Sequence, residues 1–146
     1  LRIRGCGPVG YPGSAEVVNM QPPDRLLKKG INALPTLGDG RQSGTSESPS
    51  ILHVSPESAV GGDLAIVKTG DKMTIDLNKR RVDLQITKSE FIKRRKNKKI
   101  KKLTNQTPWQ EISRSNVGQL EDGACIMSRD QYLDITKTKG VLRNSH

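Results

Sequence analysis

Aromatic side chains are scarce in this 146-residue sequence, which has one Trp, one Phe and two Tyr, or 3% of its residues. Hydrophobic residues together make up 32%, a low fraction for a chain that buries its own core. The length allows one domain with a core and is too short for two substantial domains. The composition therefore predicts either a partly disordered chain or a piece of a larger protein.

Long apolar segments are also absent. No run of residues is long and apolar enough for a membrane helix, and no signal-peptide segment is present. We therefore expect no membrane partner and a cytoplasmic location. The sequence opens on strand-like residues 1–4 without an initiator Met, which predicts that the chain starts inside a longer protein.

Cysteine is limited to Cys6 and Cys125, and neither lies in a CxxC motif or beside a histidine. The sequence therefore encodes neither a disulfide framework nor a complete metal site. A reducing compartment is the default for such a chain.

Acidic residues are too few to balance the basic ones, and the formal net charge is +10. The excess is concentrated in residues 88–102, KSEFIKRRKNKKIKK, where Glu90 is the single acid. Such a run is typical of a solvated helix face or a linker. A basic nucleic-acid-binding module is the alternative, but Phe91 is alone in the run, and aromatic residues usually accompany that function.

Residues 33–50, ALPTLGDGRQSGTSESPS, hold a short apolar run followed by glycine, hydroxyl and charged residues. Because another apolar run follows, the pattern predicts a strand, a loop and a second strand. The glycines allow unusual backbone angles, so the loop can display Asp39, Arg41, Ser43 and Thr45 together. A polar surface loop without function remains the alternative.

Residues 5–13, GCGPVGYPG, are rich in glycine and proline and predict a shaped loop rather than a regular element. A helix is expected next, with Ser14 as its N-cap and Glu16 in its first turn. In that position Glu16 is either a carboxylate that points into a cleft or a surface acid that stabilises the helix N-terminus.

Alternating hydrophobicity predicts two strands after the central loop, at residues 72–77 and 81–86, joined by a tight turn. Together with the less regular runs, the full set of expected strands is 1–4, 33–37, 51–54, 64–68, 72–77 and 81–86. Strands with one buried face are typical of a meander packed on a barrel or sandwich.

Helices are expected after Pro22, from Ser55 with Pro56 at its first position, from Lys88 and from Pro108. Trp109 is expected to anchor the C-terminal tail on the body of the protein. No regular structure is expected beyond that helix. The predicted organisation is a body at residues 1–87 and, at residues 88–146, a basic helix, a linker and a tail.

Three motifs resemble one known family. They are GPVGYPGSAEVV at residues 7–18, GDGRQSGTS at 38–46 and SPESAVGGDLAIVKTGDKMTIDLNKRRVDL at 55–84. Their combination resembles the C-terminal part of the dihydroxy-acid dehydratase and phosphogluconate dehydratase family. The resemblance implies a β-rich α/β fold, a swivelling-type β-barrel with peripheral helices, incomplete at its N-terminus.

The resemblance also implies a hydro-lyase that removes water from a 2,3-dihydroxy acid and gives a 2-keto acid. Its cofactors are an iron-sulfur cluster and Mg²⁺, and its base is a serine. The cluster ligands are implied to lie in an N-terminal domain outside this chain, so Cys6 and Cys125 are structural thiols. The chain alone is then expected to be inactive, and the full-length enzyme is expected to be a homo-oligomer.

Individual roles follow from the match of motifs. Ser43 takes the position of the serine base, and Glu16 matches the C-terminal carboxylate ligand of Mg²⁺. Thr45 and His146 are expected to bind substrate. Asp39, together with Arg41, is expected to shape the loop through a local ion pair.

The motifs are more similar to the sugar-acid branch of the family, which acts on arabinonate, xylonate and related acids, than to the branched-chain amino-acid branch. Gln42, beside the base, suits a polyhydroxylated substrate. Glu47 and His53 depart from the family pattern, which has a small residue and an amide there. A dihydroxy-acid dehydratase of branched-chain amino-acid synthesis is therefore the alternative within the enzyme class.

Overall fold

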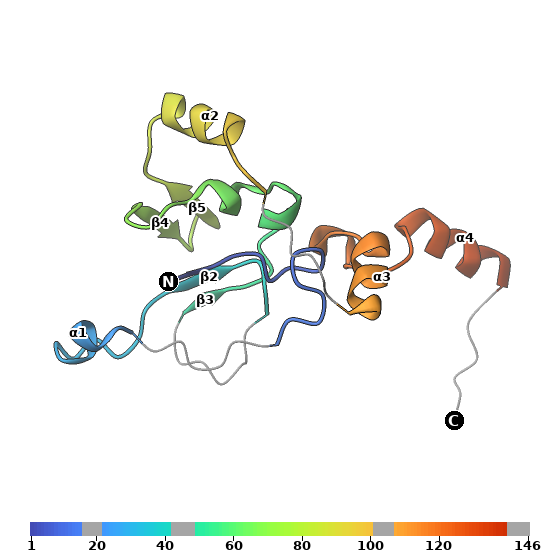
Figure 1. Ribbon diagram of the computed structural model, residues 1–146, viewed down its shortest axis with the longest axis horizontal. Coiled ribbons are helices and arrows are strands. Elements are labelled where there is room, and N and C mark those ends of the chain that lie inside the picture. The colour runs from blue at the N-terminus through green and yellow to red at the C-terminus, as the bar shows by residue number, and fades with distance from the viewer. Residues whose placement is uncertain (16–21, 42–48, 101–106, 140–146) are drawn as a thin grey trace.

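The computed structural model of the chain describes residues 1–15, 22–41, 49–100 and 107–139. A short parallel sheet lies at the centre, and a two-stranded hairpin and a helix lie to one side of it (Figure 1). The remaining long helices extend away from the sheet toward the C-terminus.

The central sheet has three strands in the order β1-β2-β3, and both pairs are parallel. The strands are β1 (Arg2–Ile3), β2 (Thr36–Gly38) and β3 (Ser50–Ile51). Leu37 of the middle strand pairs with Arg2 on one side and Ile51 on the other. All three residues of β2 are buried, as expected for a strand covered by neighbours on both edges.

The antiparallel hairpin consists of β4 (Met73–Asp76) and β5 (Arg81–Leu84). The prediction from alternation is therefore confirmed for both strands. The burial that alternation implies is weaker than expected, since Leu77, which follows β4, is 78% exposed.

Two 3₁₀-helices lie between the sheet and the hairpin, η1 (Ser58–Val60) and η2 (Asp63–Ile66). The strand predicted at residues 64–68 is wrong. The amide of Ala65 donates to the carbonyl of Gly62, so the chain makes a helical turn directly after the glycine pair. A short, fully apolar run shows no hydrophobic periodicity that would distinguish a buried strand from a helical turn. The N-cap predicted at Ser55 is also wrong, because Glu57 is the residue before η1.

The helices are α1 (Asp24–Leu27), α2 (Lys88–Lys96), α3 (Pro108–Asn116), the 3₁₀-helix η3 (Leu120–Asp122) and α4 (Arg129–Lys139). The helices expected after Pro22, from Lys88 and from Pro108 are confirmed. Thr107 caps α3 in a reciprocal arrangement with Gln110. The expectation of an irregular tail is wrong, since α4 forms there.

Trp109 does not anchor the tail. Its side chain is 80% exposed, so the prediction for this residue is wrong. Polar side chains of the same helix make the connection instead, since Gln110 donates to the carbonyl of Pro12 at 3.0 Å and Arg114 to that of Val9 at 2.8 Å.

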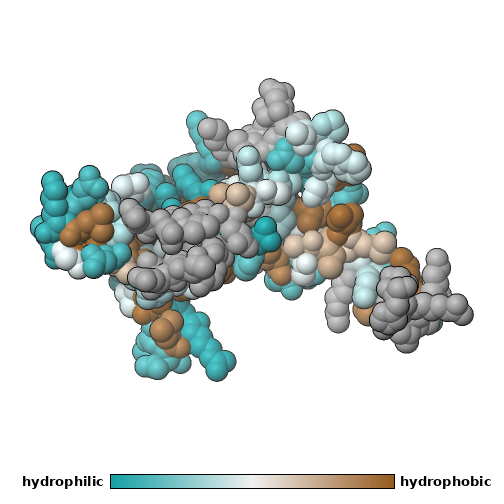
Figure 2. Space-filling view, turned by 90° about the horizontal axis from the view of Figure 1, so that it is seen from below, coloured by the Kyte–Doolittle hydropathy of each residue, from teal (hydrophilic) through white to brown (hydrophobic). Residues whose placement is uncertain are grey.

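The hydrophobic core is small. Its fully buried members are Leu37, Ala59, Leu64, Ile66 and Val67, from β2 and from the two 3₁₀-helices and their immediate surroundings. On the surface, hydrophobic residues form small separate groups among hydrophilic ones (Figure 2). Apolar packing therefore stabilises the centre of the molecule, and polar contacts stabilise the surrounding loops.

The fold class is mixed α/β, as the sequence indicates, but the described residues form no closed barrel. The pairing of β1, β2 and β3 is parallel, which a meander of consecutive strands does not produce. The barrel prediction is therefore unconfirmed, and the division at residue 87 stays a prediction. No described helix has the length and apolar character needed to cross a bilayer.

Candidate functional site

A pocket of about 210 Å³ lies where β2 ends. Ligand sites in open parallel sheets form outside the carboxyl ends of the strands, and this pocket has that position. We call it the glycine-loop pocket. Its lining consists of Cys6, Gly7, Pro8, Tyr11, Gly13, Ser14, Asp39, Gly40, Arg41, His53, Leu120 and Ala124.

Asp39 joins the central loop to the glycine-rich loop at residues 5–13. Its side chain has no exposed surface. Its two oxygens accept hydrogen bonds from the amides of Gly5 at 3.0 Å and Cys6 at 3.1 Å. Ser58 donates to Oδ2 twice, from its amide at 2.9 Å and from its hydroxyl at 2.6 Å. Asp39 therefore shapes the site by binding main-chain donors.

Glu57 holds the same loop at a second point. It is also fully buried, and its carboxylate accepts from the amides of Val9 and Gly10, both at 2.8 Å. Gln119 pairs with it twice: its side-chain NH₂ donates to the carboxylate, and its carbonyl oxygen accepts from the Glu57 amide, both at 3.0 Å. Two buried carboxylates thus fix the path of one loop.

Glycine is required where the loop meets these anchors. A Cβ added to Gly7 would lie 2.4 Å from Oε2 of Glu57, and one added to Gly40 would lie 2.6 Å from Cβ of Cys6. Both distances are far below ordinary van der Waals contact. Gly7 therefore allows the glycine-rich loop to approach Glu57, and Gly40 allows the central loop to approach Cys6.

Glu57 was missed in the analysis of the sequence, which treated it as part of a helical turn. A loop dense in glycine and proline forms few hydrogen bonds within itself, so its buried amides need acceptors from elsewhere. That requirement is the signal that a buried acid lies nearby. The identity of the acid does not follow from it, because Glu57 is 47 positions from Gly10.

Asp39 and Arg41 both line the pocket. The hydrogen bonds of Asp39 come from Gly5, Cys6 and Ser58, while the ion pair with Arg41 stays a prediction. The four other predicted site residues, Glu16, Ser43, Thr45 and His146, lie outside the described residues.

His53 is a second residue that the sequence analysis did not place in the site. It is exposed, lines the pocket and has a left-handed backbone with φ of 54°. Its amide donates to the carbonyl of Gly40 at 3.3 Å. This conformation is uncommon outside glycine and asparagine, and it is found most often where a turn or a functional site requires it.

The described residues do not make a metal site by themselves. Within residues 1–15, 22–41, 49–100 and 107–139, no three His, Cys, Asp or Glu side chains lie close enough to hold an ion. The oxygens of Asp39 and Glu57 are already bonded to amide and hydroxyl donors, so both act as anchors of the backbone. Cys6 and Cys125 are free thiols.

Comparison with known proteins shows which family the chain is similar to. The family model described as dihydroxy-acid/6-phosphogluconate dehydratase C-terminal matches residues 1–124. D-xylonate dehydratase of Caulobacter vibrioides is 54% identical over 135 residues, which are 92% of this chain and 23% of that protein. L-arabinonate dehydratase of Rhizobium leguminosarum bv. trifolii is 49% identical over 92 residues, 63% of this chain and 16% of that protein.

A dihydroxy-acid dehydratase of Thermodesulfovibrio yellowstonii is 40% identical over 125 residues, 85% of this chain and 22% of that protein. The chain therefore spans less than a quarter of the length of these three relatives. Of these matches, the two to sugar-acid dehydratases have the higher identity.

Proposed function

We propose that this chain, which belongs to the dihydroxy-acid/6-phosphogluconate dehydratase family as its C-terminal domain, forms one wall of the active site of a hydro-lyase that dehydrates a sugar acid. The observation that carries the proposal is the glycine-loop pocket, whose lining brings together residues 7–14 of the first motif and residues 39–41 of the second. The higher identity to D-xylonate dehydratase, 54% against 40% for the dihydroxy-acid dehydratase, favours a sugar acid.

Ser43 is proposed as the base and Glu16 as a ligand of Mg²⁺. Chain connectivity supports both roles, because Ser14 and Arg41 line the pocket and each proposed residue follows one of them by two positions. Thr45 and His146 are proposed to bind substrate.

In the proposed reaction the alkoxide of Ser43 accepts the C2 proton of the aldonate. The C3 hydroxyl leaves and takes up one proton to become water, so the net change is the loss of water, and the enol product tautomerises to a 2-keto-3-deoxy acid. Mg²⁺ and an iron-sulfur cluster supply Lewis acidity when they are bound in the intact enzyme. The described residues provide rigidity. Asp39 and Glu57 hold the loop at four amides, and a fixed wall keeps substrate and base in reacting geometry.

The test uses the intact protein that carries this chain, loaded with metal and cluster. Ser43→Ala is expected to abolish turnover of D-xylonate and to leave the absorption spectrum of the cluster unchanged, because the base takes no part in cluster binding. Ser46→Ala, in the same loop, is the matched control and is expected to retain activity. Retained turnover in Ser43→Ala would refute the assignment of the base.

A substrate series separates the two branches of the family. D-xylonate, L-arabinonate and 2,3-dihydroxyisovalerate are compared by kcat/KM with the same preparation. The proposal predicts the higher values for the two sugar acids. A preference for 2,3-dihydroxyisovalerate would instead support the branched-chain alternative.

A further inference from the structure

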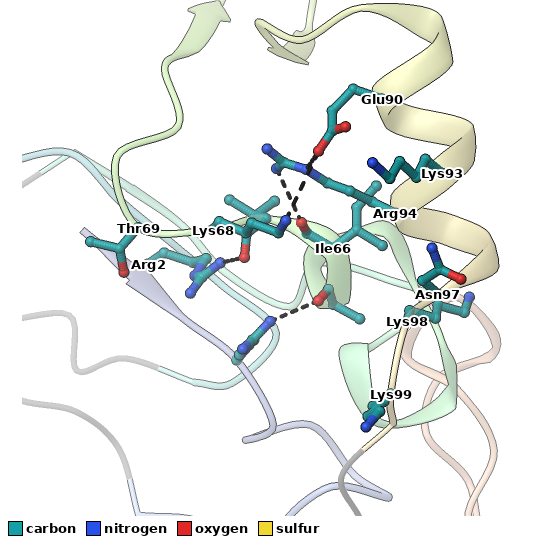
Figure 3. Close-up of a pocket in the computed structure, with 13 residues that line it drawn as sticks. Arg2, Ile66, Lys68, Thr69, Glu90, Lys93, Arg94, Asn97, Lys98 and Lys99 are labelled. Carbon is teal, nitrogen blue, oxygen red and sulfur yellow. Dashed lines mark hydrogen bonds and ion pairs between the residues drawn. The ribbon is translucent and has the colours of Figure 1, made fainter.

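A larger cleft lies away from the glycine-loop pocket, between β1, η2 and α2 (Figure 3). Its volume is about 510 Å³, and it shares no lining residue with the glycine-loop pocket. We call it the cationic cleft. Basic side chains dominate its lining, and they are Arg2, Arg4, Lys68, Lys93, Arg94, Lys98 and Lys99.

Two acids lie at the cationic cleft, and Arg94 binds both. Glu90, the acid in the lining, accepts from Arg94 at 2.7 Å and lies 3.9 Å from Nζ of Lys68. Asp71, just outside the lining, accepts from the same guanidinium at 2.6 Å. Among the described residues, the five cations Arg2, Arg4, Lys93, Lys98 and Lys99 form no ion pair. The basic side chains of the cleft therefore outnumber the acids beside it in the described part of the chain.

Hydrogen bonds to main-chain carbonyls hold several of these cations in place. Arg2 donates to the carbonyl of Val67, and Arg4 donates to that of Ala65 at 2.7 Å. Lys98 donates to the carbonyl of Gly61 at 2.5 Å. A carbonyl fixes the direction of a guanidinium or ammonium without cancelling its charge, so the remaining donors are oriented for another acceptor.

Arg2 and Arg4 lie close enough to affect each other. Burial, followed by repulsion from Arg4, lowers the pKa of Arg2. An anion between the two guanidinium groups would remove this repulsion. Fixed like charges of this kind are common where a protein binds a phosphate or carboxylate.

A smaller cavity of about 260 Å³ continues the cationic cleft, because Arg4, Ala65 and Lys99 line both. It extends to Gly5 and Gly10. These are two of the residues whose amides are bound by Asp39 and Glu57. A molecule that extended from the cationic cleft into this smaller cavity would therefore lie beside the glycine-rich loop.

We propose that the cationic cleft binds a small molecule that carries a diphosphate or triphosphate group. The volume lies in the range of small-molecule sites, roughly 300–1,000 Å³. Cations converge on the cleft from β1, from the segment after η2 and from the end of α2. Cations that approach from three segments can surround a compact anion that carries several charges. Among the residues that the structure describes, no aromatic side chain lines the cleft, so they provide no stacking surface of the kind typical of single-stranded nucleic acid sites.

Calorimetry with inorganic pyrophosphate on the intact protein, at physiological ionic strength, tests the proposal. One site per chain with a dissociation constant in the micromolar range is expected. The double variant Arg4→Gln/Lys99→Gln is expected to weaken binding by about 100-fold or more, since each of the two lost charged hydrogen bonds contributes about 1.5–3 kcal/mol. Lys28→Gln/Lys29→Gln, which removes two exposed charges elsewhere, is the matched control.

A second measurement uses the unmodified protein, so it does not depend on whether the double variant folds. Pyrophosphate is expected to protect Lys93 and Lys99 from acetylation and to leave Lys28 and Lys29 as reactive as before. Absence of binding at physiological ionic strength, equal protection of all four lysines, or tighter binding of duplex DNA than of pyrophosphate would overturn the proposal. Turnover of D-xylonate by the double variant is measured separately, so failure here leaves the proposed function standing.

Discussion

Asp39 and Glu57 are buried carboxylates whose hydrogen bonds to main-chain amides take the place of a regular element. Each accepts from two amides of the glycine-rich loop, and each has a further donor from Ser58 or Gln119. Hydrogen bonds that involve a charged group are stronger than neutral ones, and burial makes an unsatisfied donor costly. At the scale of the residue, these two side chains therefore determine whether the pocket has a fixed wall.

Glu57→Gln tests this role with a nearly isosteric change. The amide keeps one oxygen acceptor and presents an NH₂ group to the amide of Val9 or Gly10, so two donors face each other. The expected loss is about 2–3 kcal/mol in the free energy of unfolding. Urea denaturation measures it. Glu121→Gln, at an exposed position, is the control, and equal midpoints for the two variants would contradict the anchoring role of Glu57.

At the scale of the element, α2 is attached to the body by charge. None of its residues is buried, and the helix packs against η2 with Arg94 as its connection. The side chain of Arg94 is only 11% exposed and binds Asp71 and Glu90 together. These hydrogen bonds lower the pKa of both carboxyl groups. The attachment of the helix is therefore sensitive to pH.

Arg94→Met is expected to destabilise the protein at neutral pH, with a difference from the native chain that shrinks in acid. Both folded pKa values are lowered from unfolded values of about 4. The stabilisation is therefore complete above that pH and is lost as the pH falls through the lower folded values. Urea midpoints between pH 7 and pH 2 measure it.

Lys96→Met, on the same helix, is the control for that series, since Lys96 forms no ion pair among the described residues. Its difference from the native chain is expected to stay small at every pH. A destabilisation by Arg94→Met that is constant from pH 7 to pH 2 would mean that packing, rather than charge, attaches α2.

At the scale of the whole molecule, the best-fixed segment outside the core is a loop. The amides of Gly5, Cys6, Val9 and Gly10 are bonded to buried carboxylates, and α3 contacts the same loop through Gln110 and Arg114. The tail and the body are thus joined through the glycine-rich loop.

Hydrogen exchange followed by mass spectrometry tests this distribution of stability. Peptides that cover residues 5–12 are expected to exchange more slowly than peptides that cover the hairpin turn at residues 77–80, whose residues are exposed. Ordinary loops open with little cost and exchange rapidly. Equal rates for the two segments would show that the carboxylates do not hold the loop in solution.

Local pattern was sufficient for part of this structure. Alternation located β4 and β5, and a proline at the start of the helix located α3. The parallel sheet depends on the pairing of Arg2 with Leu37, and no local pattern specifies a partner at that separation. The prediction for Trp109 was wrong because a large aromatic residue favours burial only when a surface is available to cover it.

For the site too, local motifs were predictable from the sequence and contacts between distant segments were not. Motifs located both loops of the glycine-loop pocket, with Asp39 and Arg41 in its lining. The partners of Asp39 and the anchoring role of Glu57 depend on contacts between distant segments, so composition and spacing did not indicate them. The basic run was predicted as a solvated helix face or linker, whereas Arg94 and Lys98 lie half-buried in a cleft.

The way the glycine-rich loop is held has a practical consequence for protein engineering. Asp39 and Glu57 bind this loop through its amides, so the path of the loop does not depend on the side chain of Tyr11, which lines the glycine-loop pocket. Pro8 lines the pocket as well, but its ring fixes its own backbone angle. A combinatorial library at Tyr11 would therefore vary the surface of the pocket on a constant backbone, which makes this position the first choice for directed evolution.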